Sequence, residues 1–157
     1  MKELEVNCHH VASESPPKIL EVLPLEMEIF RSSWTNFISL ATLINMQCRI
    51  VELNCEILNN QELNQLIKCW IDGGIRNLEV FTMNVVLGSL RQEAEVLEGV
   101  EVMEWDAKRR PQWWRDDDYS GGKDFWRHDN GLLATVDMTL MFKFCVWHPK
   151  YLHPQQN

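Results

Sequence analysis

The chain has 157 residues, of which 45% are hydrophobic and seven are tryptophan, enough for one domain with a substantial core. Its formal net charge of −8 argues against a nucleic-acid-binding domain, whose surface would be basic. No stretch has the length and apolar character of a membrane helix or a signal peptide, so we expect an intracellular protein, cytoplasmic or nuclear.

The N-terminal residues 1–18 are expected to form a flexible tail, because polar residues and prolines replace any sustained apolar period. Within it, Cys8, His9 and His10 could ligate a metal. Adjacent ligands are a poor start for a tetrahedral site, however, and no second cluster of suitable spacing follows. The five cysteines are scattered without paired spacing, which favours buried thiols over disulfides. We therefore expect neither a metal nor another cofactor.

A first strand is predicted within 19–30, where apolar residues partly alternate and Pro24 makes the strand irregular. The segment 33–46 has apolar residues on one face and predicts a helix, with Ser32 or Ser33 as its N-cap. A domain extending over 19–148 is expected to begin here.

The segment 48–83 predicts a strand, a helix and a second strand, and its helix has the clearest signal. The apolar residues of this helix share one face: Leu63, Leu66, Ile67, Trp70 and Ile71. Asn59 and Glu62 have the spacing of a capping box, and Gly73 supplies a residue that ends a helix. Such a short unit favours two parallel strands with the helix across one face.

A pattern of three apolar positions, spaced as in Ile50, Leu53 and Cys55, recurs along the chain. Its copies start at Val22, Ile50, Ile75 and Leu97, which are 22 to 28 residues apart. Leucine-rich repeats, in which short strands alternate with helices, have periods of about 20 to 29 residues. The sequence therefore predicts an α/β domain of the leucine-rich-repeat type.

The next helix is predicted over 87–97 and is ended by Gly99, after which Val100, Val102 and Trp105 are expected to continue the sheet. The segment 108–115 is basic and rich in tryptophan, as in proteins that bind single-stranded nucleic acid, but three aspartates follow it directly. A surface loop held by tryptophans in the core is therefore the favoured interpretation. RNA binding remains an alternative, which changes of Arg109 and Arg110 would test.

The final third predicts β-structure. Asp129, Asn130 and Gly131 lie between two apolar runs, and Asn-Gly in this position is a strong hairpin signal. The run 138–147 is apolar almost throughout and predicts a strand buried on both faces. We expect the hairpin to form a C-terminal cap on the repeats, followed by a tail at 149–157.

Six segments carry a family resemblance: WT at 34–35, NMQCRIVEL at 45–53, ELNQLIKCWIDG at 62–73, WDAKRRP at 105–111, RHDNGLLATV at 127–136 and FCVWH at 144–148. In this order they resemble the type 2 F-box-associated domain of the large nematode F-box family. The resemblance implies a substrate-recognition role, because such proteins act as adaptors of SCF-type ubiquitin ligases. Their N-terminal F-box grips the Skp subunit, and the associated domain holds the target protein.

A complete F-box is not recognisable before the matching region, where only Leu23 to Glu26 resembles its opening. We therefore expect either a fragment of such an adaptor or a free-standing interaction domain without ligase contact. Ligase subunits would bind only if an F-box is supplied elsewhere.

In strands of the leucine-rich-repeat type, the leucine positions point inward and the residues between them face out. This expectation places an acidic, partly apolar stripe on the exposed face of the sheet: Glu52, Asn54, Glu56, Asn77, Glu79, Phe81, Glu101 and Met103. We expect the stripe to bind a basic segment of a protein partner. The alternative is that these glutamates only keep the sheet soluble.

An enzyme is the competing class, and no nucleophile, phosphate loop or metal motif has a specific spacing. Cys69 is expected to be a buried thiol. His128 and Asp129 could form an acid–base pair, but their position at a hairpin turn is more typical of solvated side chains. An ordered pocket that holds His128 with a second titratable group would favour an enzyme. We expect a non-catalytic interaction domain.

Overall fold

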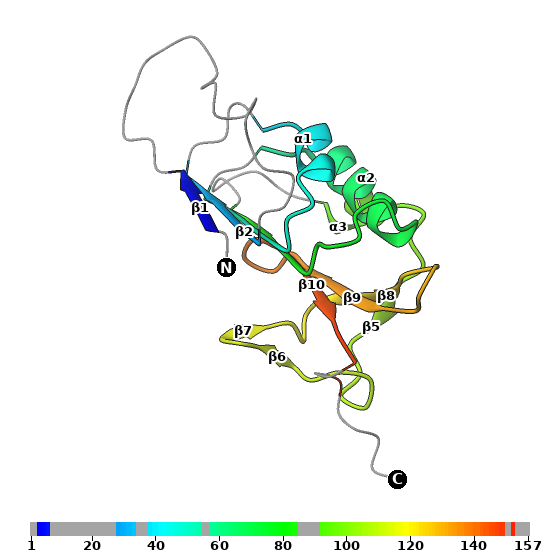
Figure 1. The fold of residues 1–157 in the computed structure, drawn as a ribbon. Helices are drawn as coiled ribbons and strands as arrows, with labels where there is room; N and C mark the ends of the chain where they lie inside the picture. The colour runs from blue at the N-terminus through cyan, green and yellow to red at the C-terminus, as the bar shows by residue number, and fades with distance from the viewer. Residues whose placement is uncertain are drawn as a thin grey trace.

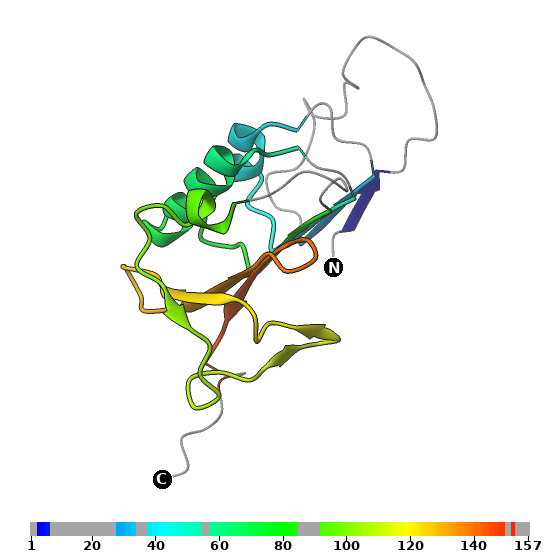
Figure 2. The same ribbon diagram turned by 180° about the vertical axis from the view of Figure 1, so that it is seen from behind.

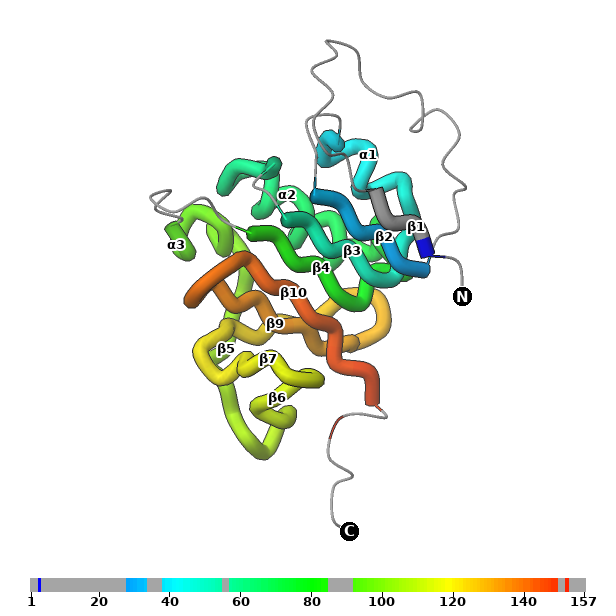
Figure 3. Tube along the Cα trace, turned by 90° about the vertical axis from the view of Figure 1, so that its left-hand side faces the viewer, coloured from blue at the N-terminus to red at the C-terminus, as the bar shows by residue number. Residues whose placement is uncertain are grey.

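The computed structural model describes residues 3–6, 28–33, 38–54, 57–84, 92–149 and 152. In this part of the chain, eight strands form one mixed sheet in the order β1-β2-β3-β4-β10-β9-β8-β5. Figures 1 and 2 show the helices gathered on one side of the sheet, and Figure 3 shows β1 to β4 and β10 side by side. Strands β6 and β7 form a separate two-stranded ribbon.

The first half of the sheet is parallel. Its strands are β1 (Glu3–Val6), β2 (Ile29–Ser32), β3 (Ile50–Leu53) and β4 (Val80–Met83). Parallel neighbours need crossover connections, and two helices provide them here. They are α1 (Leu40–Asn45), between β2 and β3, and α2 (Asn60–Ile71), between β3 and β4.

The second half of the sheet is antiparallel and begins where β10 pairs with β4. Its strands are β5 (Met103–Glu104), β8 (Lys123–Trp126), β9 (Leu133–Asp137) and β10 (Phe142–Trp147). The short helix α3 (Glu93–Val96) precedes β5, and β6 (Trp113–Trp114) and β7 (Asp117–Asp118) lie between β5 and β8. None of the described helices has the length and apolarity needed to cross a membrane.

Helix α2 is confirmed with its predicted ends. The Glu62 N–H donates to Asn59 Oδ1 and the Asn59 N–H donates to Glu62 Oε2, both at 2.9 Å, which completes the capping box. Gly73 follows the helix with φ of +86°, in the left-handed region that glycine adopts without strain. The five apolar residues predicted to share one face are all buried.

The central strands bury both of their faces. On the helix side, Val51, Leu53 and Met83 belong to the main core, whereas Ile29, Ile50 and Val80 form a small cluster against Trp114. Phe81 also faces the helices and is 1% exposed, so its predicted outward position is wrong. It packs edge-to-face on Phe142, with 5.7 Å between the ring centroids.

The repeat register also differs from the expectation. Ile50 pairs with Val80 and Leu53 with Met83, whereas the predicted equivalents Ile75 and Leu78 are buried before β4 begins. The α/β class is correct, but the leucine-rich-repeat architecture is not confirmed, since half of the sheet is antiparallel. The spacing of apolar residues predicted the wrong strand register because residues in loops, such as Ile75 and Leu78, are buried as fully as residues in strands.

Two predicted helices are shorter in the structure. Helix α1 begins at Leu40, and its N-cap is Ser39 rather than Ser32 or Ser33, because Ser39 Oγ accepts from the Thr42 N–H at 3.2 Å. Ser32 instead ends β2. Within the described residues the helix predicted over 87–97 is limited to α3, and 34–37 and 87–91 lie outside the described part of the chain.

The N-terminal segment contains one strand where only a tail was expected, since β1 pairs with β2 in parallel. The described part of the predicted 19–30 strand is the start of β2 at Ile29, and 19–27 and Cys8 to His10 lie outside the described residues. The domain boundaries near 18 and 148 stay predictions.

The C-terminal predictions hold more closely. Strands β8 and β9 are an antiparallel hairpin, and Gly131 in its loop has φ of +66°. The Arg127 N–H donates to the Leu132 carbonyl at 2.8 Å and closes this loop. All six residues of β10 are buried, as predicted for a strand covered on both faces.

Candidate functional site

Two carboxylates of the predicted acidic stripe, in β3 and just before β4, form ion pairs within the chain. Glu52 forms an ion pair with Arg31. Glu79 Oε2 lies 3.5 Å from Arg49 Nη1, and its Oε1 lies 3.1 Å from His148 Nε2. Two of the expected partner-binding carboxylates are thus already occupied.

The amides of the stripe also contact neighbouring loops. Asn54 is exposed just after β3, and its Nδ2 lies 3.4 Å from Ser33 Oγ. Asn77 is exposed before β4, and its Nδ2 lies 3.5 Å from the Gln47 carbonyl oxygen. Glu56 lies outside the described residues.

The last two residues of the stripe lie at a different place on the sheet. Glu101 and Met103 are just before and within β5, and β10, β9 and β8 separate β5 from β4. Four steps between neighbouring strands, at about 4.8 Å each, put β5 roughly 19 Å from β4. The expected continuous stripe is therefore wrong, because the strands were predicted to follow one another in chain order.

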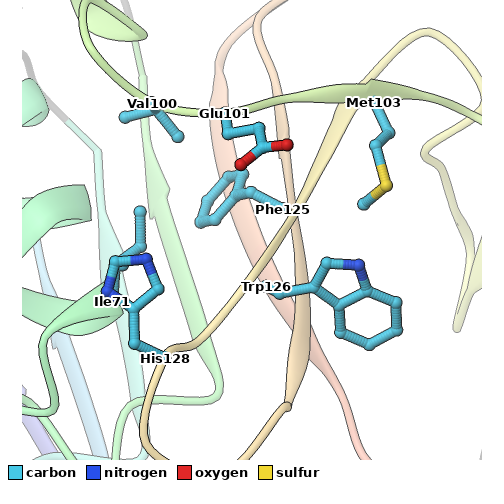
Figure 4. Close-up of a pocket in the computed structure, with 7 residues that line it drawn as sticks. All are labelled: Ile71, Val100, Glu101, Met103, Phe125, Trp126 and His128. Carbon is cyan, nitrogen blue, oxygen red and sulfur yellow. The ribbon is translucent and has the colours of Figure 1, made fainter.

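Glu101 and Met103 instead border a pocket at the edge of the sheet, of about 140 Å³. We call it the edge pocket, and its lining residues are Ile71, Val100, Glu101, Met103, Phe125, Trp126 and His128. Figure 4 shows the segment with Val100, Glu101 and Met103 on one side and the segment with Trp126 and His128 on the other. Three distant parts of the sequence meet here, at the end of α2, before β5 and around β8.

The inner wall of the edge pocket is apolar, because Ile71 and Phe125 both belong to the main core. An apolar cavity of about 150 Å³ can hold a molecule the size of benzene. The indole of Trp126 borders this space and is 44% exposed. Large apolar groups that stay exposed around a hollow are typical of an interaction site.

Two titratable side chains border the edge pocket, Glu101 and His128, which is the condition set above for considering an enzyme. His128 Nδ1 lies 3.4 Å from Asp72 Oδ1, and both side chains are about three-quarters exposed. Asp129 pairs with Arg127 instead, with 2.9 Å between Oδ1 and Nε. The predicted His128–Asp129 pair is not formed, and Glu101 has no ion pair with any described residue, so no coupled acid and base converge on the pocket.

The basic loop 108–115 is held by a buried carboxylate. Arg110 is fully buried, and its Nε donates to Asp124 Oδ1 at 2.8 Å. Arg109 Nη1 donates to Asp124 Oδ2 at 2.9 Å. One carboxylate thus holds both guanidinium groups, and because Arg110 is fully buried it cannot contact the phosphates that RNA binding needs.

The tryptophans of this loop differ from each other. Trp114 packs edge-to-face on Trp147 at 5.9 Å, as expected for a loop held by tryptophan, but Trp113 is 54% exposed. The Arg110 guanidinium also lies 4.9 Å from the ring centroid of Trp147. The sequence did not point to a buried Arg110, because arginine is almost never fully buried unless paired, and its partner lies on another strand.

The cysteines among the described residues are free thiols: Cys48, Cys69 and Cys145. Burial raises the pKa of Cys48 to about 11 and raises the pKa of Cys145 further. For Cys69, burial is the larger cause of a raised pKa, and the nearby Asp72 carboxylate adds to it. A thiol with a raised pKa is a poor nucleophile at neutral pH. Nowhere in the described ranges do three His, Cys, Asp or Glu side chains gather in a way that could hold a metal ion.

Comparison with known proteins points to a family. Residues 18–83 match the family described as F-box associated, and no curated protein or solved structure matches the chain. The matched range contains β2, α1, β3, α2 and β4, the parallel half of the sheet and its two crossover helices. Residues 18–83 therefore resemble the F-box-associated family of type 2, a family of protein-interaction domains.

Proposed function

We propose that this chain is a protein-binding module that holds a target protein, in the manner of the substrate-recognition domain of an SCF-type ubiquitin-ligase adaptor. The family match supports a protein partner. The observation that carries the proposal is the edge pocket, where the exposed Trp126 borders an apolar hollow beside Glu101.

In this proposal, one apolar side chain of the target enters the edge pocket and packs against Ile71 and Phe125. Full burial of a Leu, Met or Phe side chain contributes about 1.5 to 3 kcal/mol. Trp126 would cover the inserted group, as aromatic anchors commonly do at interfaces. The Glu101 carboxylate is exposed at the rim and favours a basic residue next to the inserted one.

A domain that binds its partner without ligase contact is the second candidate, and it would use the same pocket. RNA binding through 108–115 is not proposed, because Arg109 and Arg110 are both held by Asp124.

The test compares proteins captured by the tagged chain and by its Trp126→Ala variant, with quantitative mass spectrometry. We expect target proteins to fall at least about tenfold with Trp126→Ala, since anchor residues contribute 2 kcal/mol or more. Lys108→Ala is the matched control, because Lys108 is exposed and its side chain forms no ion pair with the described residues. Equal capture by a folded Trp126→Ala protein would remove the edge pocket from the proposal.

Ligase contact is read from the same experiment. Recovery of Skp and cullin subunits with the wild-type chain would support the adaptor role. Target proteins that depend on Trp126, without ligase subunits, would favour the free-standing domain.

A further inference from the structure

Four large apolar side chains are exposed within the described residues: Val102, Trp113, Trp126 and Leu140. Trp126 lines the edge pocket, and Val102 lies just before β5. Trp113, 54% exposed, and Leu140, 90% exposed, both line a second hollow of about 490 Å³. It lies between the β6–β7 ribbon and the turn from β9 to β10, which Figures 1 and 2 show on the same side of the molecule.

We call this hollow the acidic cleft. Its lining residues are Trp113, Asp116, Asp117, Asp118, Ser120, Gly121, Asp137, Thr139, Leu140 and Lys143. Four of these are aspartates, and Lys143 is the one cation among them. The cleft is therefore acidic as well as partly apolar.

Lys143 is already engaged on the cleft wall. Its Nζ donates to the Asp118 carbonyl oxygen at 2.8 Å and lies 3.8 Å from Asp117 Oδ1. The same ammonium group lies 4.6 Å from the ring centroid of Tyr119. These contacts hold the ammonium group near Asp117 and Asp118, and it forms no ion pair with Asp116 or Asp137.

Asp137 is a buried carboxylate that lines the acidic cleft. It is 2% exposed, and its Oδ1 accepts one hydrogen bond from the Thr139 N–H at 2.8 Å. Lys143 is its partner in the β9–β10 register, but their side chains form no ion pair within 4 Å. No other described cation pairs with Asp137. A buried carboxylate without a cation is costly, so an arriving positive group would be stabilised here.

The other carboxylates of the cleft differ in what they already bind. Asp118 accepts from the Ser120 N–H at 2.7 Å and from Gln112 Nε2 at 3.1 Å, and the Ser120 contact is the main reason that its pKa is lowered. Asp116 is exposed and has no ion pair with a described residue. Of the four aspartates, Asp117 is the one whose carboxylate lies within 4 Å of a described cation, so Asp116, Asp118 and Asp137 can each pair with an incoming cation.

We propose that the acidic cleft is a second docking surface, which takes an arginine side chain with apolar neighbours from a protein partner. A guanidinium group can stack on the exposed face of Trp113 and donate to carboxylates, a combination that suits arginine better than lysine. Leu140 then contacts an apolar neighbour of that arginine. Nucleic acid does not fit, since four aspartates repel phosphate. The cleft shares no residue with the edge pocket, so this proposal stands independently of the proposed function.

The test uses the purified chain and synthetic peptides in which one arginine lies between two apolar residues, chosen from Leu, Ile, Val and Phe. Each peptide has a counterpart with citrulline, which keeps the shape of arginine and removes its charge. We expect the arginine peptides to bind at least about tenfold more tightly, because hydrogen bonds to charged groups contribute about 1.5 to 3 kcal/mol. Binding should weaken as salt is raised.

Protein variants locate the binding. Trp113→Ala and Asp116→Asn change exposed residues and should keep the fold, and each is expected to weaken arginine-peptide binding severalfold; Asp137→Asn should do the same if it folds. Trp126→Ala, at the edge pocket, is the matched control and should leave this binding unchanged. The proposal is overturned if no arginine peptide binds, if citrulline peptides bind equally, or if Trp113→Ala and Asp116→Asn have no effect. Competition by stoichiometric Ca²⁺ would also overturn it, by identifying a metal site instead.

Discussion

Asp124 is fully buried and binds three side chains at once. It accepts from Arg109, from Arg110 and from the Thr135 hydroxyl, the last at 2.6 Å. Thr135 Oγ1 in turn accepts from Trp147 Nε1 at 2.8 Å, which extends the network across β8, β9 and β10. Every oxygen of this buried charge is therefore satisfied, as a buried ion pair requires.

We expect Asp124→Ala to lower the free energy of unfolding by about 3 to 5 kcal/mol, because it leaves Arg110 buried without a counter-charge. Urea denaturation followed by tryptophan fluorescence measures the change. The double variant Arg110→Met with Asp124→Leu removes both charges and should recover part of the loss. If the Asp124→Ala protein were as stable as the wild type, Arg110 would have to reach solvent in that variant.

Cys48 gives a prediction for alkaline pH. Its pKa rises from 9.0 to about 11 on folding, so the protonated thiol favours the folded state. This contribution is complete below pH 9 and is lost as pH rises toward 11, by at most roughly 2 to 3 kcal/mol. Cys48→Ala should flatten the decline of unfolding free energy between these two pH values, compared with wild type. An identical slope in both proteins would contradict the assignment to Cys48.

For single helices and turns, the sequence predicted the structure correctly where an element is defined by contacts between residues close together in the chain. The capping box and apolar face of α2, and the Asn-Gly turn between β8 and β9, depend on residues a few positions apart. The pairing of β10 with β4 joins distant segments, and no local spacing specifies it. The edge pocket was missed for the same reason, although Glu101 and Met103 were singled out individually.

The N-cap of α2 can be tested directly. Asn59→Ala removes the acceptor for the Glu62 N–H, and we expect a loss of about 0.5 to 2 kcal/mol in unfolding free energy. Gln61→Ala, at an exposed position in the same first turn, is the control and should stay within about 0.5 kcal/mol of wild type. Equal stability of the two variants would show that the cap is replaced by solvent.

In the whole molecule, the hydrophobic core extends beyond the segment that matches the family. The match ends at residue 83, but Trp70 of α2 packs edge-to-face on Phe125 and Phe144, at 6.0 and 5.3 Å between centroids. Strand β4 likewise has β10 as its neighbour. The matching segment thus shares its core with the second half of the chain.

We expect a fragment of residues 1–91 to lack a cooperative fold, because it would expose Trp70 and the β10-facing edge of β4. Loss of near-ultraviolet circular dichroism and of a cooperative urea transition, compared with the full chain, would show this. A fragment with a sharp transition would mean that the parallel half folds on its own.

The position of β10 also has a consequence during synthesis on the ribosome. Strand β4 ends at Met83 and its neighbour ends at Trp147, 64 residues later (147 − 83). At about 5 to 20 residues per second, translation takes roughly 3 to 13 seconds to cover this distance. During that interval the edge of β4 that pairs with β10 is open and Trp70 is uncovered, so the yield in cells should depend on chaperones that shield such surfaces until elongation is complete.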